Sequence, residues 1–163
     1  MASFTLEEIE KATGASLLQK GEDAFVEGVS TDTRTISRGE LFIALIGENF
    51  NGHEFLKRAV LSGASAVMIS DASYGKDIDA HVSVFLVKDT KKGLEDLAHF
   101  HRMRFQVPVI GVTGSNGKTT TKDMITSILR TRFHVTATEK NFNNEIGLSM
   151  TLLSMTAETE VCV

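Results

Sequence analysis

The sequence is poor in residue types that often carry a recognisable structural role. Its 163 residues include one cysteine, one proline and no tryptophan. The single cysteine, Cys162, excludes an internal disulfide and a zinc site built from several cysteines. Long apolar runs are also missing, because the longest stretch without a charged residue, Phe105 to Gly117, is too short to span a bilayer. We therefore expect no membrane insertion.

The amino-terminal segment bears on the cellular location of the protein, and the overall charge bears on the partners that it binds. The first charged residue is Glu7, and no basic start followed by an apolar run indicates a signal peptide, so we expect a cytoplasmic protein. Acidic residues number 21 against 17 basic ones, and the net charge of −4 argues against a nucleic-acid partner. With 42% hydrophobic and 23% charged residues, the composition is typical of a folded globular protein.

Short apolar runs alternate with segments of helical spacing along the chain. Thr5, with Glu8 three residues later, is suited to begin a helix that Gly14 ends. Strands that alternate with helices favour an α/β fold with a mainly parallel sheet. The patterns predict strands at residues 40–47, 66–70, 82–87 and 107–113, and helices at residues 5–12, 53–61, 90–105 and 118–132.

The sequence also suggests a division into two parts. Pro108 opens a predicted strand after a long predicted helix, and we place a domain boundary near residue 107. Residues 1–107 carry the whole net charge of −4, whereas residues 108–163 hold five basic and five acidic groups. The sequence stops in the apolar run that ends at Val163, although domains usually end at exposed polar positions. The reason for this ending is open at this point.

The strongest chemical signal is the segment from Gly111 to Thr121, GVTGSNGKTTT. It places three glycines between a predicted strand and a predicted helix, so that free backbone N–H groups and the helix N-terminus can bind phosphate. Lys118 is then placed to reach the terminal phosphates, and the Thr119 hydroxyl to bind Mg²⁺. The standard phosphate-loop pattern requires a glycine at Val112, so an ordinary turn with a surface lysine remains the alternative.

Four segments together resemble the Mur ligases, a family of ATP-dependent amide ligases. The phosphate-loop segment VTGSNGKTTT matches the family's own loop pattern, and the resemblance covers nearly the whole chain. At one position the family often has aspartate where this sequence has Asn51. The other three segments are VSTDTR at 29–34, GHEF at 52–55, and KNFNNEIG at 140–147 followed by TLL at 151–153.

The resemblance implies a fold, an activity and a set of partners. Residues 1–107 are expected to form an α/β domain that binds a uridine nucleotide, and residues 108–163 the first part of a P-loop ATPase domain with a mainly parallel sheet. The KNFNNEIG segment points to the family reaction of peptidoglycan precursor synthesis that adds D-alanyl-D-alanine to UDP-N-acetylmuramoyl-tripeptide through an acyl phosphate. ATP and Mg²⁺ are the implied cofactors, and a monomer is expected.

The resemblance also implies roles for individual residues. Lys118 and Thr119 are the catalytic candidates, and Thr119 is also the metal candidate. Ser30, Asp32 and Arg34 alternate, so on a strand end all three would point one way and suit a uracil edge and a diphosphate; a local Asp–Arg pair is the alternative. The phosphate-binding candidates are Gly114, Ser115, Asn116, Gly117, Lys118, Thr119 and Thr120, and the substrate-binding candidates are Ser30, Asp32, Arg34, Asn141 and Asn144.

Several interpretations stay open at this stage. Asn141 and Asn144 are placed to bind the nucleotide substrate or its peptide, or else only to cap a helix and form a turn. For His53, a contact with the substrate and the capping of its own helix are both open. Two alternatives to the proposed reaction also stay open. The protein is another family member, which adds the third residue or acts in folate-polyglutamate or cyanophycin synthesis, or it is a UDP-substrate-binding module without catalysis. We expect the 163-residue chain alone to be inactive as a ligase, because a magnesium-binding glutamate of the family would follow Val163.

Overall fold

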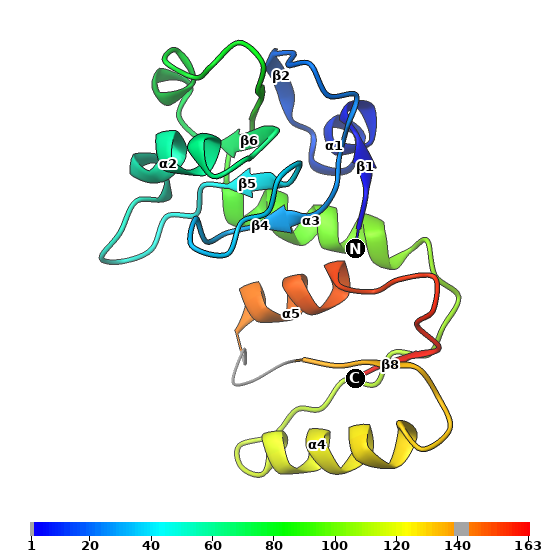
Figure 1. Ribbon diagram of the computed structural model, residues 1–163. Coiled ribbons are helices and arrows are strands. Elements are labelled where there is room, and N and C mark those ends of the chain that lie inside the picture. The colour runs from blue at the N-terminus through cyan, green and yellow to red at the C-terminus, as the bar shows by residue number, and fades with distance from the viewer. Residues whose placement is uncertain (1, 139–143) are drawn as a thin grey trace. The chain divides into compact units, whose positions relative to one another are not determined.

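A computed structural model describes residues 2–138 and 144–163. The described residues form two compact units, residues 2–97 and residues 98–163 (Figure 1). Helix α3 (Thr90–Arg102) contains the point at which one unit gives way to the other. Among the described residues, no helix combines the length and the apolar character needed to cross a membrane.

The unit 2–97 is built on a five-stranded sheet with the order β2-β7-β6-β5-β4. Neighbouring strands from β7 to β4 run parallel, and β2 pairs antiparallel with β7 at the edge. A separate antiparallel pair joins β1 (Phe4–Thr5) and β3 (Phe25–Val26). The sheet strands are β2 (Ser16–Gln19), β4 (Val29–Ser30), β5 (Leu41–Ile43), β6 (Ala66–Ile69) and β7 (Ser83–Leu86). The predicted α/β fold with a mainly parallel sheet is confirmed.

The central strands of this sheet are buried on both faces, as the continuous apolar runs predict. Every residue of β5 and β6 is buried, and so are the first three residues of β7. The predicted strand 40–47 is shorter than expected, because the chain turns back after Ile43. Leu45 donates to the carbonyl of Ile43, and Ile46 pairs with Asn51 across the turn.

Helix α1 (Leu6–Thr13) begins and ends where local chemistry predicts. The Thr5 hydroxyl accepts from the Glu8 N–H at 3.2 Å, and the Thr5 N–H donates to the Glu8 carboxylate at 2.9 Å. Gly14 ends the helix with a φ of 67°, a left-handed conformation that glycine adopts without strain. The predicted helix 53–61 is split into η1 (Gly52–Phe55) and α2 (Leu56–Leu61), and a second short helix, η2, follows at Ala72–Gly75.

His53 connects the loops that follow β5 and β6 through hydrogen bonds of its ring. Its Nε2 accepts from the Ser70 N–H at 2.9 Å, so this nitrogen carries no proton. Its Nδ1 lies 2.8 Å from the Oδ1 of Asn51, and the Asn51 side chain also caps η1 by accepting from the His53 N–H. Burial lowers the pKa of His53 below its ordinary value of 6.5, and the negative charge of Asp71 opposes this effect. The imidazole is therefore neutral and fills a structural position.

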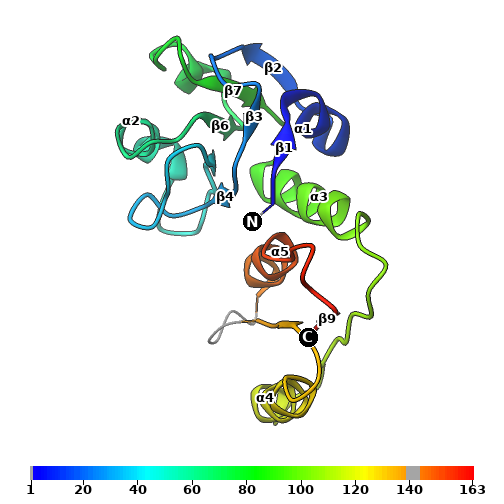
Figure 2. The ribbon, with the colours of Figure 1, turned by 45° about the vertical axis from the view of Figure 1, so that its right-hand side comes forward.

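The unit 98–163 places a small parallel sheet between two helices (Figures 1 and 2). Strand β8 (Val135–Thr136) pairs in parallel with β9 (Val161–Cys162). Helix α4 (Lys118–Leu129) lies on one side of this pair and α5 (Glu145–Leu153) on the other. Two large apolar side chains of α4 remain exposed, Met124 at 60% and Ile128 at 67%.

The predicted strand 107–113 is not a regular strand in the structure. Val109 forms an isolated parallel bridge with Cys162, supported by the Ile110 N–H donating to the Cys162 carbonyl at 2.8 Å. The Cys162 N–H donates to the Pro108 carbonyl at 3.0 Å. Pairing stops after this short stretch because the chain then enters its glycine-rich turn. The segment follows the direction of a strand without the length of one.

The difference in burial predicts a difference in local stability. Amides of β5, β6 and β7 are expected to exchange with solvent more slowly than amides of β8 and β9, because the first group lies in a five-stranded buried sheet and the second in a two-stranded one. Hydrogen exchange followed by mass spectrometry on the 163-residue chain measures this. Equal protection in the two groups would contradict the prediction.

The neutral state of His53 predicts a dependence of stability on pH. Its pKa is lowered in the folded chain, so the unfolded chain binds more protons below the ordinary value of 6.5 and stability falls as the pH drops from there toward the folded pKa. Nuclear magnetic resonance titration of the ring should give a pKa below 6.5. The N51D variant should raise that pKa by placing a carboxylate against Nδ1. A ring that titrates at or above 6.5 in the unmodified chain would show that burial does not control it.

Candidate functional site

The glycine-rich turn forms an open loop at the N-terminus of α4. Gly117 is the N-cap residue of this helix with a φ of 76°, and Gly114 has a φ of 150°. Both angles lie in a region that residues with side chains rarely adopt, so glycine is required at both positions. A Cβ atom at Gly111 or Gly117 would meet no atom within 4 Å. The space beside the loop is therefore open, and the unpaired N–H groups of the first helical turn face a position suited to an anion.

The two catalytic candidates follow the loop directly. The Lys118 ammonium donates to the carbonyl of Gly114, so the side chain bends back across the loop instead of extending into solvent. Thr119 is exposed and lines a cavity next to Lys118. Thr120 lies outside the lining of that cavity. The structure thus brings a cation and a hydroxyl to the mouth of the loop, as the sequence predicts.

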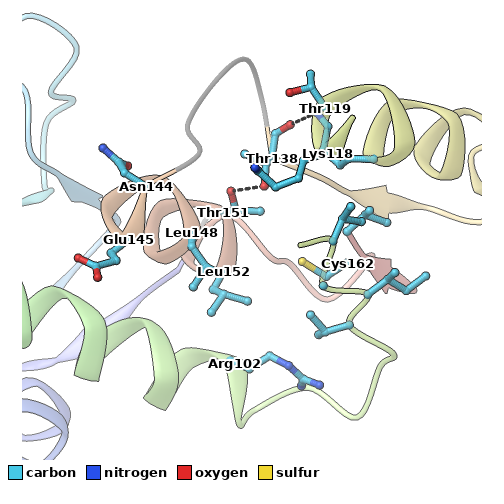
Figure 3. Close-up of a pocket in the computed structure, with 16 residues that line it drawn as sticks. Arg102, Lys118, Thr119, Thr138, Asn144, Glu145, Leu148, Thr151, Leu152 and Cys162 are labelled. Atoms are coloured by element: carbon cyan, nitrogen blue, oxygen red, sulfur yellow. Dashed lines mark hydrogen bonds between the residues drawn. The ribbon is translucent and has the colours of Figure 1, made fainter. Parts of the chain in front are cut away.

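A cavity of about 490 Å³ opens beside this loop within the unit 98–163 (Figure 3). Its volume lies in the range of small-molecule sites. The lining includes Lys118 and Thr119, which follow the glycine-rich loop, and Asn144, the N-cap residue of α5. The remaining lining residues are Arg102, Val109, Ile110, Gly111, Val112, Lys122, Thr138, Glu145, Leu148, Thr151, Leu152, Cys162 and Val163.

Asn144 caps helix α5. Its Oδ1 accepts from the Gly147 N–H at 2.8 Å, and its backbone is extended, as N-cap residues usually are. The side chain therefore performs the capping that the sequence left as one of two interpretations, while its position in the cavity lining keeps a substrate contact as a prediction. Asn141 lies outside the described residues.

Cys162 is a buried lining residue of the cavity and not a nucleophile. Burial raises the pKa of its thiol, and the positive charge of Arg102 opposes that effect. Within residues 2–138 and 144–163, no group of three His, Cys, Asp or Glu side chains could hold a metal ion. A metal at this site would therefore depend on the Thr119 hydroxyl together with ligands from a bound nucleotide and water.

The three substrate candidates of the first unit do not alternate along a strand. Strand β4 ends at Ser30, and the chain then turns through residues 33–35. The buried Ser30 hydroxyl accepts from the Asp32 N–H at 3.2 Å and donates to the Asp32 carbonyl at 3.1 Å, which fixes the start of this turn. The expectation that all three side chains point one way on a strand is wrong, because local hydrogen bonds fold the segment back on itself.

Asp32 and Arg34 form the local ion pair that the sequence left as an alternative. Arg34 Nη2 lies 2.6 Å from one carboxylate oxygen, and Arg34 Nε lies 2.9 Å from the other. Hydrogen bonds from the Arg34 side chain lower the pKa of Asp32 to about 2. The Arg34 side chain is 77% exposed. The pair therefore orients a guanidinium group at the carboxyl end of a parallel strand while leaving it accessible.

Lys122 is among the lining residues that the sequence reasoning missed. Lys122 lines the cavity from α4, and its ammonium donates to the Thr138 carbonyl at 2.8 Å. Its spacing of four residues from Lys118 was the available signal, because residues four apart lie on one face of a helix. The partner carbonyl of Thr138 had no signal in the sequence.

Comparison with known proteins gives matches over most of the chain. A model of the Mur ligase family, catalytic domain, matches residues 25–102, and a model of the Mur ligase middle domain matches residues 112–163. A UDP-N-acetylmuramoyl-tripeptide–D-alanyl-D-alanine ligase from Bacillus subtilis (strain 168) is 46% identical over 142 residues, which are 87% of this chain and 31% of that protein. The chain thus spans about a third of the length of the curated relatives it matches.

Solved structures show the same relationship. A crystal structure of MurF from Acinetobacter baumannii aligns with a TM-score of 0.88 and 32% identity, over 100% of this chain and 35% of that one. MurF ligase from Thermotoga maritima, solved in complex with ADP, aligns with a TM-score of 0.73 and 31% identity, over 85% of this chain and 31% of that one. Family models, relatives and structures agree with the phosphate loop and the fold described above, and the chain belongs to the Mur ligase family.

Proposed function

We propose that this chain is part of an ATP-dependent ligase that joins D-alanyl-D-alanine to UDP-N-acetylmuramoyl-tripeptide. The observation that carries the proposal is the cavity lined both by Lys118 and Thr119 of the phosphate loop and by the start of α5, which Asn144 caps. The Bacillus subtilis relative with that name, at 46% identity, supports this member of the family over the one that adds the third residue and over the folate and cyanophycin types.

The reaction needs little covalent chemistry from the protein. The terminal carboxylate of the tripeptide attacks the γ-phosphorus of ATP, which gives an acyl phosphate and ADP. The amine of D-alanyl-D-alanine then attacks the acyl carbon, and phosphate leaves through a tetrahedral intermediate. Both steps involve anions that repel each other, so positioning and charge neutralisation supply most of the rate enhancement.

The loop residues have distinct tasks in this scheme. The backbone N–H groups of Gly114, Ser115, Asn116 and Gly117 bind phosphate oxygens, with Thr120 as a weaker candidate. Lys118 exchanges its contact with the Gly114 carbonyl for the β- and γ-phosphates. The Thr119 hydroxyl is an oxygen ligand of the kind that Mg²⁺ prefers, and the ion would neutralise charge that develops on the phosphates.

The first domain, residues 1–107, would bind the uridine nucleotide, and residues 108–163 would be the first part of the ATP-binding domain. Ser30, Asp32 and Arg34 support the first assignment, because Ser30 ends β4 and the other two follow it, at the carboxyl edge of a parallel sheet, where open α/β folds bind ligands. Asn141 and Asn144 would contact the nucleotide substrate or its peptide. The proposed enzyme is a monomer and lies in the cytoplasm.

A chimera tests the activity directly. Residues 1–163 replace the matching third of the Bacillus subtilis relative, and the product is expected to release phosphate only when UDP-N-acetylmuramoyl-tripeptide and D-alanyl-D-alanine are both present with ATP and Mg²⁺. Coupled phosphate release and mass spectrometry of the product measure the reaction. Activity with folate and glutamate in place of these substrates, or none with any pair, would contradict the proposal. The 163-residue chain alone is expected to bind the UDP substrate in calorimetry without forming the amide.

Substitution in the phosphate loop separates nucleotide binding from fold. K118M should weaken the binding of ADP by about 10- to 100-fold, because the charge-assisted contacts to phosphate are lost. T121V is the matched control and should change ADP affinity little, since Thr121 is exposed and lies outside the cavity lining. Isothermal titration of the chimera measures both. Unchanged ADP affinity in K118M would remove Lys118 from the site.

A further inference from the structure

Thr138, the residue two positions after β8, connects three elements of the unit 98–163. Its N–H donates to the carbonyl of Val163 at 3.1 Å, which links it to the strand β9 side of the sheet. Its carbonyl accepts from the Lys122 ammonium of α4 at 2.8 Å, and its hydroxyl lies 3.2 Å from the hydroxyl of Thr151 in α5. One short segment therefore joins the sheet, the phosphate-loop helix and the helix that follows it.

The contact between Lys122 and Thr138 is the strongest of these links. The Lys122 side chain is only 17% exposed, so its ammonium has lost much of its water and depends on protein acceptors. A hydrogen bond from a charged donor is about twice as strong as one between neutral groups. The second contact of the ammonium, to Asp123 at 2.8 Å, involves a carboxylate that is 61% exposed. Exposed ion pairs contribute little, so the Thr138 carbonyl is the acceptor that fixes Lys122.

From Thr138 the contacts continue to Asn144. The Thr151 hydroxyl contacts the Gly147 carbonyl at 2.8 Å, and the Gly147 N–H donates to the Asn144 side chain at 2.8 Å. Figure 3 shows Thr138 and Thr151 joined by a dashed line beside the start of α4. A continuous series of hydrogen bonds thus runs from Lys122, one turn after Lys118, to the first turn of α5.

We propose that Lys122 is a positioning residue of the ligase reaction. It holds the end of β8 against the phosphate-loop helix and so sets Asn144 and the first turn of α5 relative to Lys118 and Thr119. In this proposal the largely buried ammonium keeps its contact with the Thr138 carbonyl during the reaction and acts through that contact, not through phosphate. The proposal rests on the proposed function and deepens it, because it names what aligns the nucleotide with the other substrate.

The test compares three variants of the chimera. K122M removes the ammonium and should lower kcat about 10- to 100-fold, since a displacement of about 1 Å in a reacting group can cost that much. The dissociation constant for ADP should not change. K122R restores a charged donor and should recover most of kcat. D123N is the matched control, because it removes only the exposed carboxylate, and it should leave kcat unchanged.

Hydrogen exchange on the 163-residue chain provides a readout that does not require ligase activity. K122M should speed exchange of the amides of Thr138 and Gly147, whereas D123N should not. Unchanged exchange and unchanged kcat in K122M would each overturn the proposal. A loss of ADP affinity as large as that of K118M would overturn it in favour of direct phosphate contact. Equal loss of kcat and melting temperature in K122M and K122R would show a purely structural role.

An inactive unmodified chimera would contradict the proposed ligase function. The exchange experiment would still decide whether Lys122 fixes the segment from Thr138 to α5. The two proposals can therefore fail separately.

Discussion

The left-handed conformation of Gly117 is the constraint on which the candidate site depends. It turns the chain from the loop directly into α4, so that the helix begins at Lys118 with its first N–H groups unpaired by the helix itself. The same turn fixes the rotation of α4 about its axis. Lys118 then faces back over the loop toward Gly114, and Lys122, one turn later, reaches Thr138. A single backbone angle thus places one lysine over the glycine-rich loop and the other against Thr138.

The ion pair between Asp32 and Arg34 orients an exposed guanidinium group through local hydrogen bonds. Two hydrogen bonds hold the guanidinium in one plane, yet the pair is exposed, and exposed pairs are weak in water. An anionic substrate that binds Arg34 would therefore have to overcome only the small free energy of this ion pair, and the guanidinium would already be oriented. Ser30 is buried beneath the turn, and the hydrogen bonds of its hydroxyl to the Asp32 backbone hold the turn in place.

Much of this structure could be predicted from the sequence, and two predictions failed for different physical reasons. Thr5, Glu8 and Gly14 marked the limits of α1 because capping depends on neighbours within a few residues. The phosphate loop was predictable for the same reason. The predicted strand 107–113 failed because its pairing depends on β9, more than fifty positions along the chain. The turn after Ser30 was missed because a serine hydroxyl and two backbone groups, which any strand also contains, determine it.

Binding and catalysis make different demands on this chain, and the described residues meet them unequally. Phosphate binding needs open N–H groups, a helix N-terminus and a cation, and the segment from Gly114 to Lys118 provides all three. Mg²⁺ prefers six oxygen ligands, and within the described residues the loop offers the Thr119 hydroxyl, while phosphates and water would supply others. In the proposed reaction, phosphoryl transfer requires that this charge cluster be held in a fixed position relative to the tripeptide carboxylate. Packing fixes such a position. In this unit the contacts from Lys122 through Thr138 to α5 hold the phosphate-loop helix and α5 relative to each other.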